Sequence, residues 1–180
     1  MSNLNCATGW YRSIIESLFG IEFDTGGMTV IPLDLPLGPM KLRQLVHRGS
    51  MWDVSVENGG RSLDLIRIDG RPLHGCTKIP SRYHDNASHQ LEVTYAAREP
   101  GPLFTEIVNA EVIESRGDHD RSTVTVRALG TVDVAFPTAV PVQLSLDGTV
   151  VPFSDDLHTH TGFAQLPIYG THELSLSRVA

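Results

Sequence analysis

The apolar residues of one short segment, residues 8–21, recur at helical spacing, and no later segment repeats this pattern. They form two adjacent stripes, which are Trp10, Ile14 and Leu18, and Tyr11, Ile15 and Phe19. This spacing predicts one amphipathic helix, and Gly20 favours its end because glycine readily adopts a left-handed conformation. A helix this short is marginal in water, so we expect it to pack on a β-sheet, on a helical domain or on a second copy of the chain.

The rest of the chain shows the two-residue alternation that is typical of half-buried β-strands. Trp52, Val54 and Val56 fall on one side of a strand, and the polar residues between them fall on the other. Together with the segment before it, this strand predicts a β-hairpin over residues 41–57. Shorter segments with strand-like patterns are 63–68, 89–95, 104–114, 122–129, 142–146, 162–166 and 172–177.

Two segments of the chain resemble each other. Residues 63–73 read LDLIRIDGRPL, and residues 142–151 read VQLSLDGTVV. After a loop, each is followed by a strand that begins with histidine, HQLEVTY from His89 and HELSLSR from His172. The shared unit is a strand, an Asp-Gly turn, a short strand, a loop and another strand. We expect the histidine-led strand to close the sheet in each copy.

The Asp-Gly pairs are the strongest local signal within these two units. Asp-Gly supplies the positive backbone φ angles that a two-residue hairpin turn requires. We therefore expect Asp69-Gly70 and Asp147-Gly148 to join antiparallel strands. Leu65 and Leu144 are expected to face a core.

The repeated strand signals predict an all-β fold. A single strand unit cannot bury its own apolar face, so a second layer is required. We expect an antiparallel β-sandwich, either one continuous sandwich or two small ones, preceded by a single short N-terminal α-helix. The run REPGP at residues 98–102 breaks the strand pattern. It divides the chain into the helix at 1–20, a β-sandwich module at 21–98, and a second β-sheet module or continuation of the first at 103–180.

Composition narrows the classes of function. The chain has 180 residues, is 41% hydrophobic and carries 14 basic against 21 acidic residues, for a net charge of −7. This balance argues against nucleic acid and membrane partners. The two cysteines, Cys6 and Cys76, lie outside any metal-ligand spacing, and the N-terminus shows no signal peptide pattern. We therefore expect a cytoplasmic protein in a reducing compartment.

Residues 8–95 carry a series of motifs in a characteristic order. They are TGWYRSIIESLFGI, MTVIPLDLP, HRGSMWDVSVEN, LIRIDGRPLHGCTKIP and HQLEV. In this order they resemble the C-terminal end of the inverting glycoside phosphorylases of the cellobiose phosphorylase type, which include the related domain of cyclic β-1,2-glucan synthases. Residues 100–180 lie outside the resemblance.

The resemblance implies a fold, and it implies which part of the protein supplies the catalytic residues. In that family the matching helix is the last one of an α/α barrel, and the strands after it form a C-terminal β-sandwich. The family's catalytic aspartate and most of its sugar contacts come from the barrel, so no residue here inherits a catalytic role. A threonine just before the closing helix helps to hold phosphate in the family, and Thr8 is the nearest candidate. The residues alone favour a different role for Thr8, as a hydroxyl that caps the helix.

The sequence offers few other candidates for catalytic or metal-binding residues. The acid pairs Asp118 with Asp120 and Asp155 with Asp156 stand in polar loop segments, which is typical of solvated turns. His158 and His160 alternate like a pair of metal ligands, but no third ligand stands at a recognisable spacing. We expect no catalytic residue, no metal ion and no cofactor. Cys76 is expected to be a small buried apolar residue.

Aromatic side chains that remain exposed could stack on sugars. Trp52 alternates in phase with Val54 and Val56 and is expected in the core. Tyr83, in the polar loop SRYHD, and Tyr169, between Pro167 and Gly170, are the candidate carbohydrate-binding residues.

The sequence thus predicts the non-catalytic C-terminal β-sandwich region of a carbohydrate-active enzyme, of the glycoside phosphorylase or hydrolase type. Its role would be structural, capping a helical barrel and burying the helix, with no activity in this chain alone. Two alternatives remain open. One is a free-standing carbohydrate-binding module. The other is a β-sandwich interaction module that associates through the helix.

Overall fold

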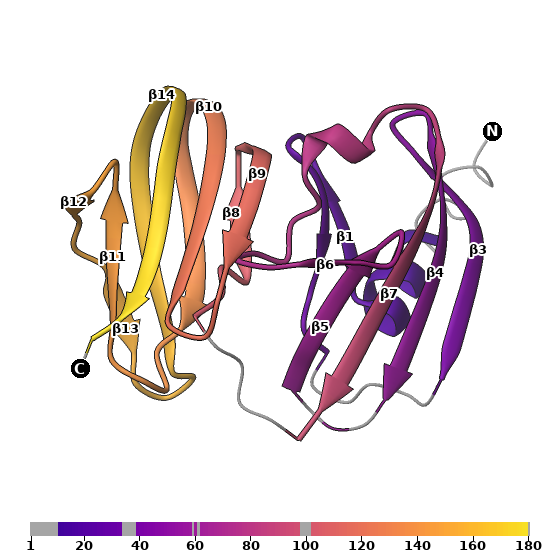
Figure 1. Ribbon diagram of the computed structural model, residues 1–180, viewed down its shortest axis with the longest axis horizontal. Coiled ribbons are helices and arrows are strands. Elements are labelled where there is room, and N and C mark those ends of the chain that lie inside the picture. The colour runs from indigo at the N-terminus through magenta and orange to yellow at the C-terminus, as the bar shows by residue number, and fades with distance from the viewer. Residues whose placement is uncertain (1–10, 34–38, 59, 61, 98–101, 180) are drawn as a thin grey trace, which may run out of the picture.

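The computed structural model describes residues 11–33, 39–58, 60, 62–97 and 102–179. Figure 1 shows two β-sheet units side by side, with one short helix packed in the N-terminal unit. The all-β, sandwich-like fold with a single short N-terminal helix is therefore confirmed. Among the described residues, no helix has the length and apolar character needed to span a membrane.

The helix packs on the first sheet through Ile15 and Phe19 of one predicted stripe, with Leu18 of the other stripe packed beside them. Residues 11–14 are α-helical, and η1 (Ile15–Phe19) continues as a π-helical turn. It ends at Gly20, whose φ of 61° is the predicted left-handed stop. Ile15 and Phe19 are buried in the core, whereas 53% of Tyr11 and 38% of Ile14 are exposed. Trp10 lies outside the described residues.

The first unit is a mixed five-stranded sheet whose inner face is covered by the helix and by a two-stranded hairpin. In spatial order the sheet strands are β3 (Met40–His47), β4 (Ser50–Asn58), β7 (Ser88–Ala96), β5 (Ser62–Ile68) and β6 (Arg71–Leu73). The hairpin consists of β1 (Ile21–Asp24) and β2 (Gly27–Val30), and a short 3₁₀ turn, η2 (Ser81–Tyr83), precedes β7. All pairs are antiparallel except β4 with β7, which is parallel. The predicted alternation of β4 is confirmed, because Trp52, Val54 and Val56 are all buried.

The second unit is a seven-stranded antiparallel sheet built on two long strands. Its strands are β8 (Glu106–Val108), β9 (Glu111–Gly117), β10 (Arg121–Pro137), β11 (Val142–Leu146), β12 (Thr149–Val150), β13 (Ser154–Asp156) and β14 (Thr161–Arg178). β10 and β14 pair along their whole length. At one end β9 flanks β10 and β11 flanks β14, and at the other end β8 and β13 take these places.

The two long strands fold over on themselves to make the two layers of a sandwich. Figure 1 shows β10 and β14 curving over together at the upper end of this unit. The midpoint of their pairing is at Leu129 and Tyr169, which are 88% and 73% exposed. Inward residues from both sides of this midpoint, such as Val124 and Val134, share one apolar core. The sequence predicted three separate short strands here, but they are parts of this continuous ribbon.

A hydrogen-bonded segment, residues 76–79, joins the two units. Its backbone bonds to β2 on one side, where Val30 N–H donates to Thr77 O. On the other side Thr77 N–H donates to Phe104 O. Cys76 is fully buried at this join, as predicted, and burial raises the pKa of its thiol to about 11. The units are therefore linked by backbone hydrogen bonds as well as by the chain connection.

Two details of the internal repeat differ from prediction. The histidine-led strands do not close their sheets, because β7 lies between β4 and β5, and β14 between β10 and β11. Leu144 is buried, but Leu65 is only half-buried. A register shift between Leu63 and Leu65 turns the strand, so that Ile66 and Ile68 face the core instead.

Candidate functional site

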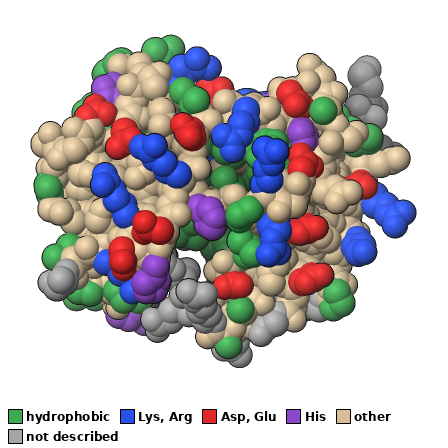
Figure 2. Space-filling model, in the orientation of Figure 1, with side chains coloured by type: hydrophobic (Ala, Val, Ile, Leu, Met, Phe, Trp, Pro, Cys, Tyr) green, Lys and Arg blue, Asp and Glu red, His purple; other side chains and the backbone are tan. Residues whose placement is uncertain are grey.

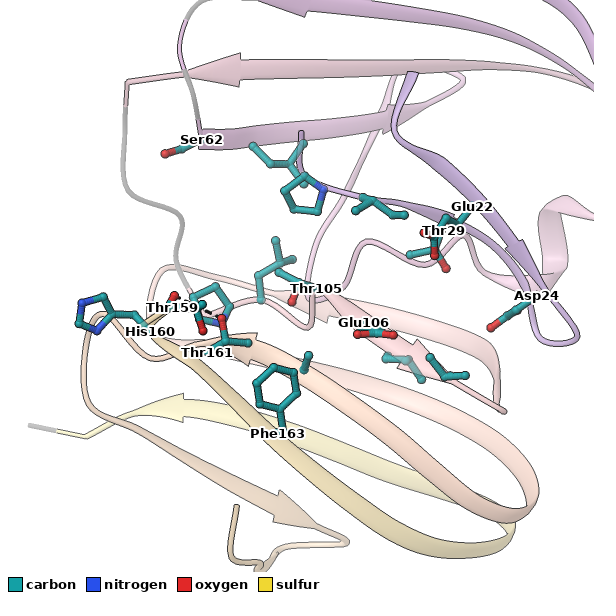
Figure 3. A pocket seen from close by; sticks show the side chains of 18 residues that line it. Glu22, Asp24, Thr29, Ser62, Thr105, Glu106, Thr159, His160, Thr161 and Phe163 are labelled. Carbon is teal, nitrogen blue, oxygen red and sulfur yellow. Dashed lines mark hydrogen bonds between the residues drawn. The ribbon is translucent and has the colours of Figure 1, made fainter. Parts of the chain in front are cut away.

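A groove of about 750 Å³ lies between the two units. Figure 3 shows it bounded by the β1–β2 hairpin and β5 on one side and by β8, β10 and the start of β14 on the other. Its volume is in the range of ligand pockets, roughly 300–1,000 Å³. Figure 2 shows that hydrophobic side chains also gather in the hollow between the units on the face turned to the viewer, whereas charged side chains of both signs spread over both units.

Strand geometry places the acidic side chains of this groove. Glu22 and Asp24 are two residues apart on β1, so both point to the same side of the hairpin. Glu106 opens β8 and pairs with Ala135 of β10. Figure 3 shows Glu22 and Glu106 projecting from opposite sides of the groove. The site thus gathers carboxylates from strands that are more than 80 positions apart in the sequence.

The wall of the groove is largely apolar. Phe163 of β14 is 45% exposed and contributes an aromatic ring. Ile31, Pro32, Leu103 and Pro137 continue this wall. Hydroxyl groups of threonine and serine stand between the apolar residues. Among the described lining residues there is no lysine or arginine.

Asp24 is already engaged with a buried lysine. Lys78 Nζ lies 2.7 Å from Asp24 Oδ2 and donates a second bond of 2.7 Å to Ile107 O. Burial lowers the pKa of Lys78, and the hydrogen bond with Asp24 opposes this shift. The other carboxylate oxygen of Asp24 accepts bonds from the N–H groups of Gly26 and Gly27. Asp24 is therefore a structural group that anchors the join between the units.

Glu22 and Glu106 differ from Asp24 in having no ion-pair partner within the described part of the chain. Partial burial and then the nearby charges of Glu16 and Glu106 raise the pKa of Glu22, and the nearby charge of Arg12 opposes this shift. The groove therefore concentrates negative charge beside an apolar wall. It can accept hydrogen bonds and attract a positive group, and it disfavours anions.

The sequence-predicted site residues lie elsewhere. Thr8 falls outside the described residues. Tyr83 is half-buried against the first core, with the ring of His89 edge-on at 5.5 Å and the guanidinium of Arg82 over its face at 5.0 Å. Tyr169 is well exposed at the fold-over of the second unit. Neither tyrosine lines the groove.

A chain of ring contacts closes one end of the first core, and sequence reasoning missed it. Phe23, His47, His84, Trp52, His89 and Tyr83 follow one another with ring centroids 4.7–6.3 Å apart. Burial lowers the pKa of His84 to about 4, so this imidazole is neutral at pH 7. The sequence signal was weak, because the three histidines stand in separate strands and loops.

The polar loops of the second unit act as turns. Asp118 accepts backbone N–H bonds from Asp120 and Arg121, and Asp156 accepts one from His158. His160 lines the outer end of the groove. Within the described residues, no group of three or more His, Cys, Asp or Glu side chains is arranged to hold a metal ion.

Glu22, Glu106 and Phe163 were not selected from the sequence. The strand patterns placed 106 and 163 on strands, but nothing indicated that those strands would face the segment after the helix. Comparison with models of protein families finds no match for this chain, and comparison with curated proteins finds none either.

Proposed function

We propose that this chain is the non-catalytic β-sandwich region of a carbohydrate-active enzyme, of the glycoside phosphorylase or hydrolase type, and that it packs against a helical partner domain. The observation that carries this proposal is the helix, which is buried through some of its apolar residues and exposed through others. Ile15 and Phe19 anchor it to the first sheet, whereas Ile14 and, one turn before Ile15, Tyr11 leave apolar surface exposed. A partner helix would cover this surface, as one helix covers the next in a barrel of helices.

The geometry of the groove is consistent with a non-catalytic role for this chain. Glycosidic bond cleavage by inversion needs a carboxylic acid poised against a second base, or against phosphate, in an enclosed site. Glu22 and Glu106 are exposed side chains at the edges of an open groove. Within the described residues, neither side chain is held in one orientation by a hydrogen bond, as a preorganised catalytic carboxyl commonly is.

A site-specific cross-linking experiment tests the partner. A photoreactive phenylalanine analogue at Ile14, in protein expressed in its source cells, should cross-link to a helical segment identified by mass spectrometry. The same analogue at Val150, which is 58% exposed on β12, is the matched control. Equal cross-linking at both positions, or none at Ile14, would contradict the proposal.

An activity assay tests the absence of catalysis. The purified chain should not turn over β-linked disaccharides with or without phosphate. Turnover that a single aspartate substitution in this chain abolishes would refute the non-catalytic role.

A carbohydrate-binding module is the second candidate, and exposed Tyr169 is the observation that favours it. Of the exposed aromatic residues, Tyr11 lies on the helix, whereas Phe163 and Tyr169 both lie on β14, Phe163 near its start and Tyr169 at the fold-over. Titration calorimetry with oligosaccharides should show no heat that Tyr169→Ala removes, whereas heat that disappears in this variant would favour the module.

A further inference from the structure

The groove between the two units combines a negative edge with an apolar wall, and none of its described lining residues belongs to the helix. Glu22 and Glu106 stand at its edges without ion-pair partners in the described part of the chain. A basic side chain between them would relieve the repulsion that their proximity creates. An anionic ligand would increase the repulsion, and a neutral sugar would leave it unchanged.

The apolar wall adds a second requirement. Phe163, Leu103 and Pro137 form part of a surface that a bare cation would leave in water. Burying it needs an occupant with apolar groups next to its positive charge. At about 750 Å³, the groove accommodates a short extended segment and excludes a folded domain.

The geometry points to a docking groove for an extended polypeptide segment of a partner protein, in which a lysine or arginine follows or precedes apolar side chains. The basic group lies between Glu22 and Glu106, and the apolar side chains cover Phe163. Peptide segments of this kind commonly bind in preformed grooves, with charge setting their orientation. No described residue of the helix lines the groove, so the peptide test and the cross-linking test at Ile14 probe different residues.

Selection from a library of random linear peptides displayed on phage tests this inference, with the biotinylated chain as bait. The enriched peptides should share a basic residue beside aliphatic or aromatic residues. A synthetic peptide from the enriched set should bind about tenfold or more weakly to the double variant Glu22→Lys, Glu106→Lys. Its affinity should also fall with added salt.

Two further variants keep the result interpretable. The double variant Glu57→Lys, Glu114→Lys makes the same change of charge at exposed positions outside the groove and should bind the peptide normally. Phe163→Ala should weaken binding through the apolar wall, and unchanged thermal melting would show that the fold persists.

Three outcomes overturn the inference. They are the absence of any enriched peptide, enrichment of acidic peptides, and binding that both charge variants leave intact. A fourth outcome would also overturn the peptide proposal. If a cello-oligosaccharide shifted the amide resonances of the groove, and if substitution of Phe163 but not of Glu22 removed these shifts, the groove would be a saccharide site.

Discussion

His172 Nδ1 lies 2.6 Å from Asp147 Oδ2, and the same contact exists in the first unit, where His89 Nδ1 lies 2.8 Å from Asp69 Oδ2. The other carboxylate oxygen of each aspartate accepts the N–H of the residue after the histidine, at 2.9 Å and 2.8 Å. Each aspartate N–H donates to the backbone carbonyl of that same residue. In both units, a histidine on a central strand thus binds the aspartate of an Asp-Gly turn, and we call this contact the His–Asp clasp. The internal repeat inferred from the sequence is confirmed.

The two turns are also alike in their backbone. Asp69 and Asp147 have φ of 52° and 49°, and the glycines after them have φ of 75° and 78°. Positive φ at both central residues is the conformation expected for Asp-Gly in a tight hairpin. Both turns join antiparallel strands, β5 with β6 and β11 with β12.

Gly70→Val and Gly148→Val should each destabilise the protein by about 1–2 kcal/mol, because a β-branched residue is strained at positive φ. A Cβ at either position would meet no atom within 4 Å, so the effect comes from the backbone alone. Gly130 has equally open surroundings without positive φ, and Gly130→Val is the control with little expected change. Urea unfolding measures all three, and an equal loss in the control would contradict the explanation.

His89→Gln should destabilise the protein more than His172→Gln. His89 is 7% exposed and also contacts Asp85 at 3.0 Å, whereas the side chain of His172 is 30% exposed. Losing two hydrogen bonds between charged groups at His89 should reduce the free energy of unfolding by about 2 kcal/mol near pH 6. Equal effects of the two substitutions would show that burial does not distinguish the two clasps.

The effect of His89→Gln should also depend on pH. Burial lowers the pKa of His89, but its hydrogen bonds with Asp69 and Asp85 outweigh burial and raise the pKa above 6.5. The stabilisation is therefore fully present below pH 6.5 and is lost as the pH rises through the raised value. The stabilisation is lost again in strong acid. The pKa values of Asp69 and Asp85 are lowered from 3.8, and once the pH falls through these lowered values the protonated carboxyl groups no longer pair with His89. If the difference in the free energy of unfolding between wild type and His89→Gln stayed constant over this pH range, the contact of His89 with its aspartates would not depend on charge.

Ile15→Asp should destabilise the protein by about 4 kcal/mol, because it places an unpaired charge in the first core. Ile15 is 1% exposed and packs with the buried residues of the five-stranded sheet. Ile14→Asp is the matched substitution on the outer side of the helix and should have a much smaller effect. Thermal melting compares the two, and an equal loss would mean that the helix is buried on both sides.

Local signals in the sequence predicted most of the elements. The alternation around Trp52 gave the buried face of β4, Gly20 gave the helix end, and the Asp-Gly pairs gave both hairpins. Each of these features depends on neighbours within a few residues, so the sequence carries it directly.

Features that depend on distant partners were not predictable in the same way. The segments 122–129, 162–166 and 172–177 were predicted as separate strands, although they lie within a ribbon that bends and stays paired. The groove was missed because Glu22 and Phe163 meet only after the two units are joined. The parallel pairing of β4 with β7 likewise depends on the path of the chain between them.

Lys78 should be the most sensitive single residue at the join between the units. Its side chain is fully buried, and it bonds to Asp24 of β1 and to the carbonyl of Ile107 in β8. Lys78→Ala would leave both partners unpaired and should destabilise the protein by about 3–5 kcal/mol. Lys78→Met keeps most of the side-chain volume and should lose less.

The thiol of Cys76 provides a local measurement of the same join. It is buried and donates a hydrogen bond to the carbonyl of Lys78 at 3.3 Å, so it should react slowly with a thiol reagent in the wild type. In a Cys6→Ser background, Lys78→Ala should accelerate this reaction, because breaking the ion pair loosens the segment that holds Cys76. Ile15→Asp is the control, since it destabilises the first core without removing a hydrogen bond of the join. If the thiol reacted equally fast in both variants at matched stability, exposure would follow global unfolding, and Lys78 would have no specific role in holding the two units together.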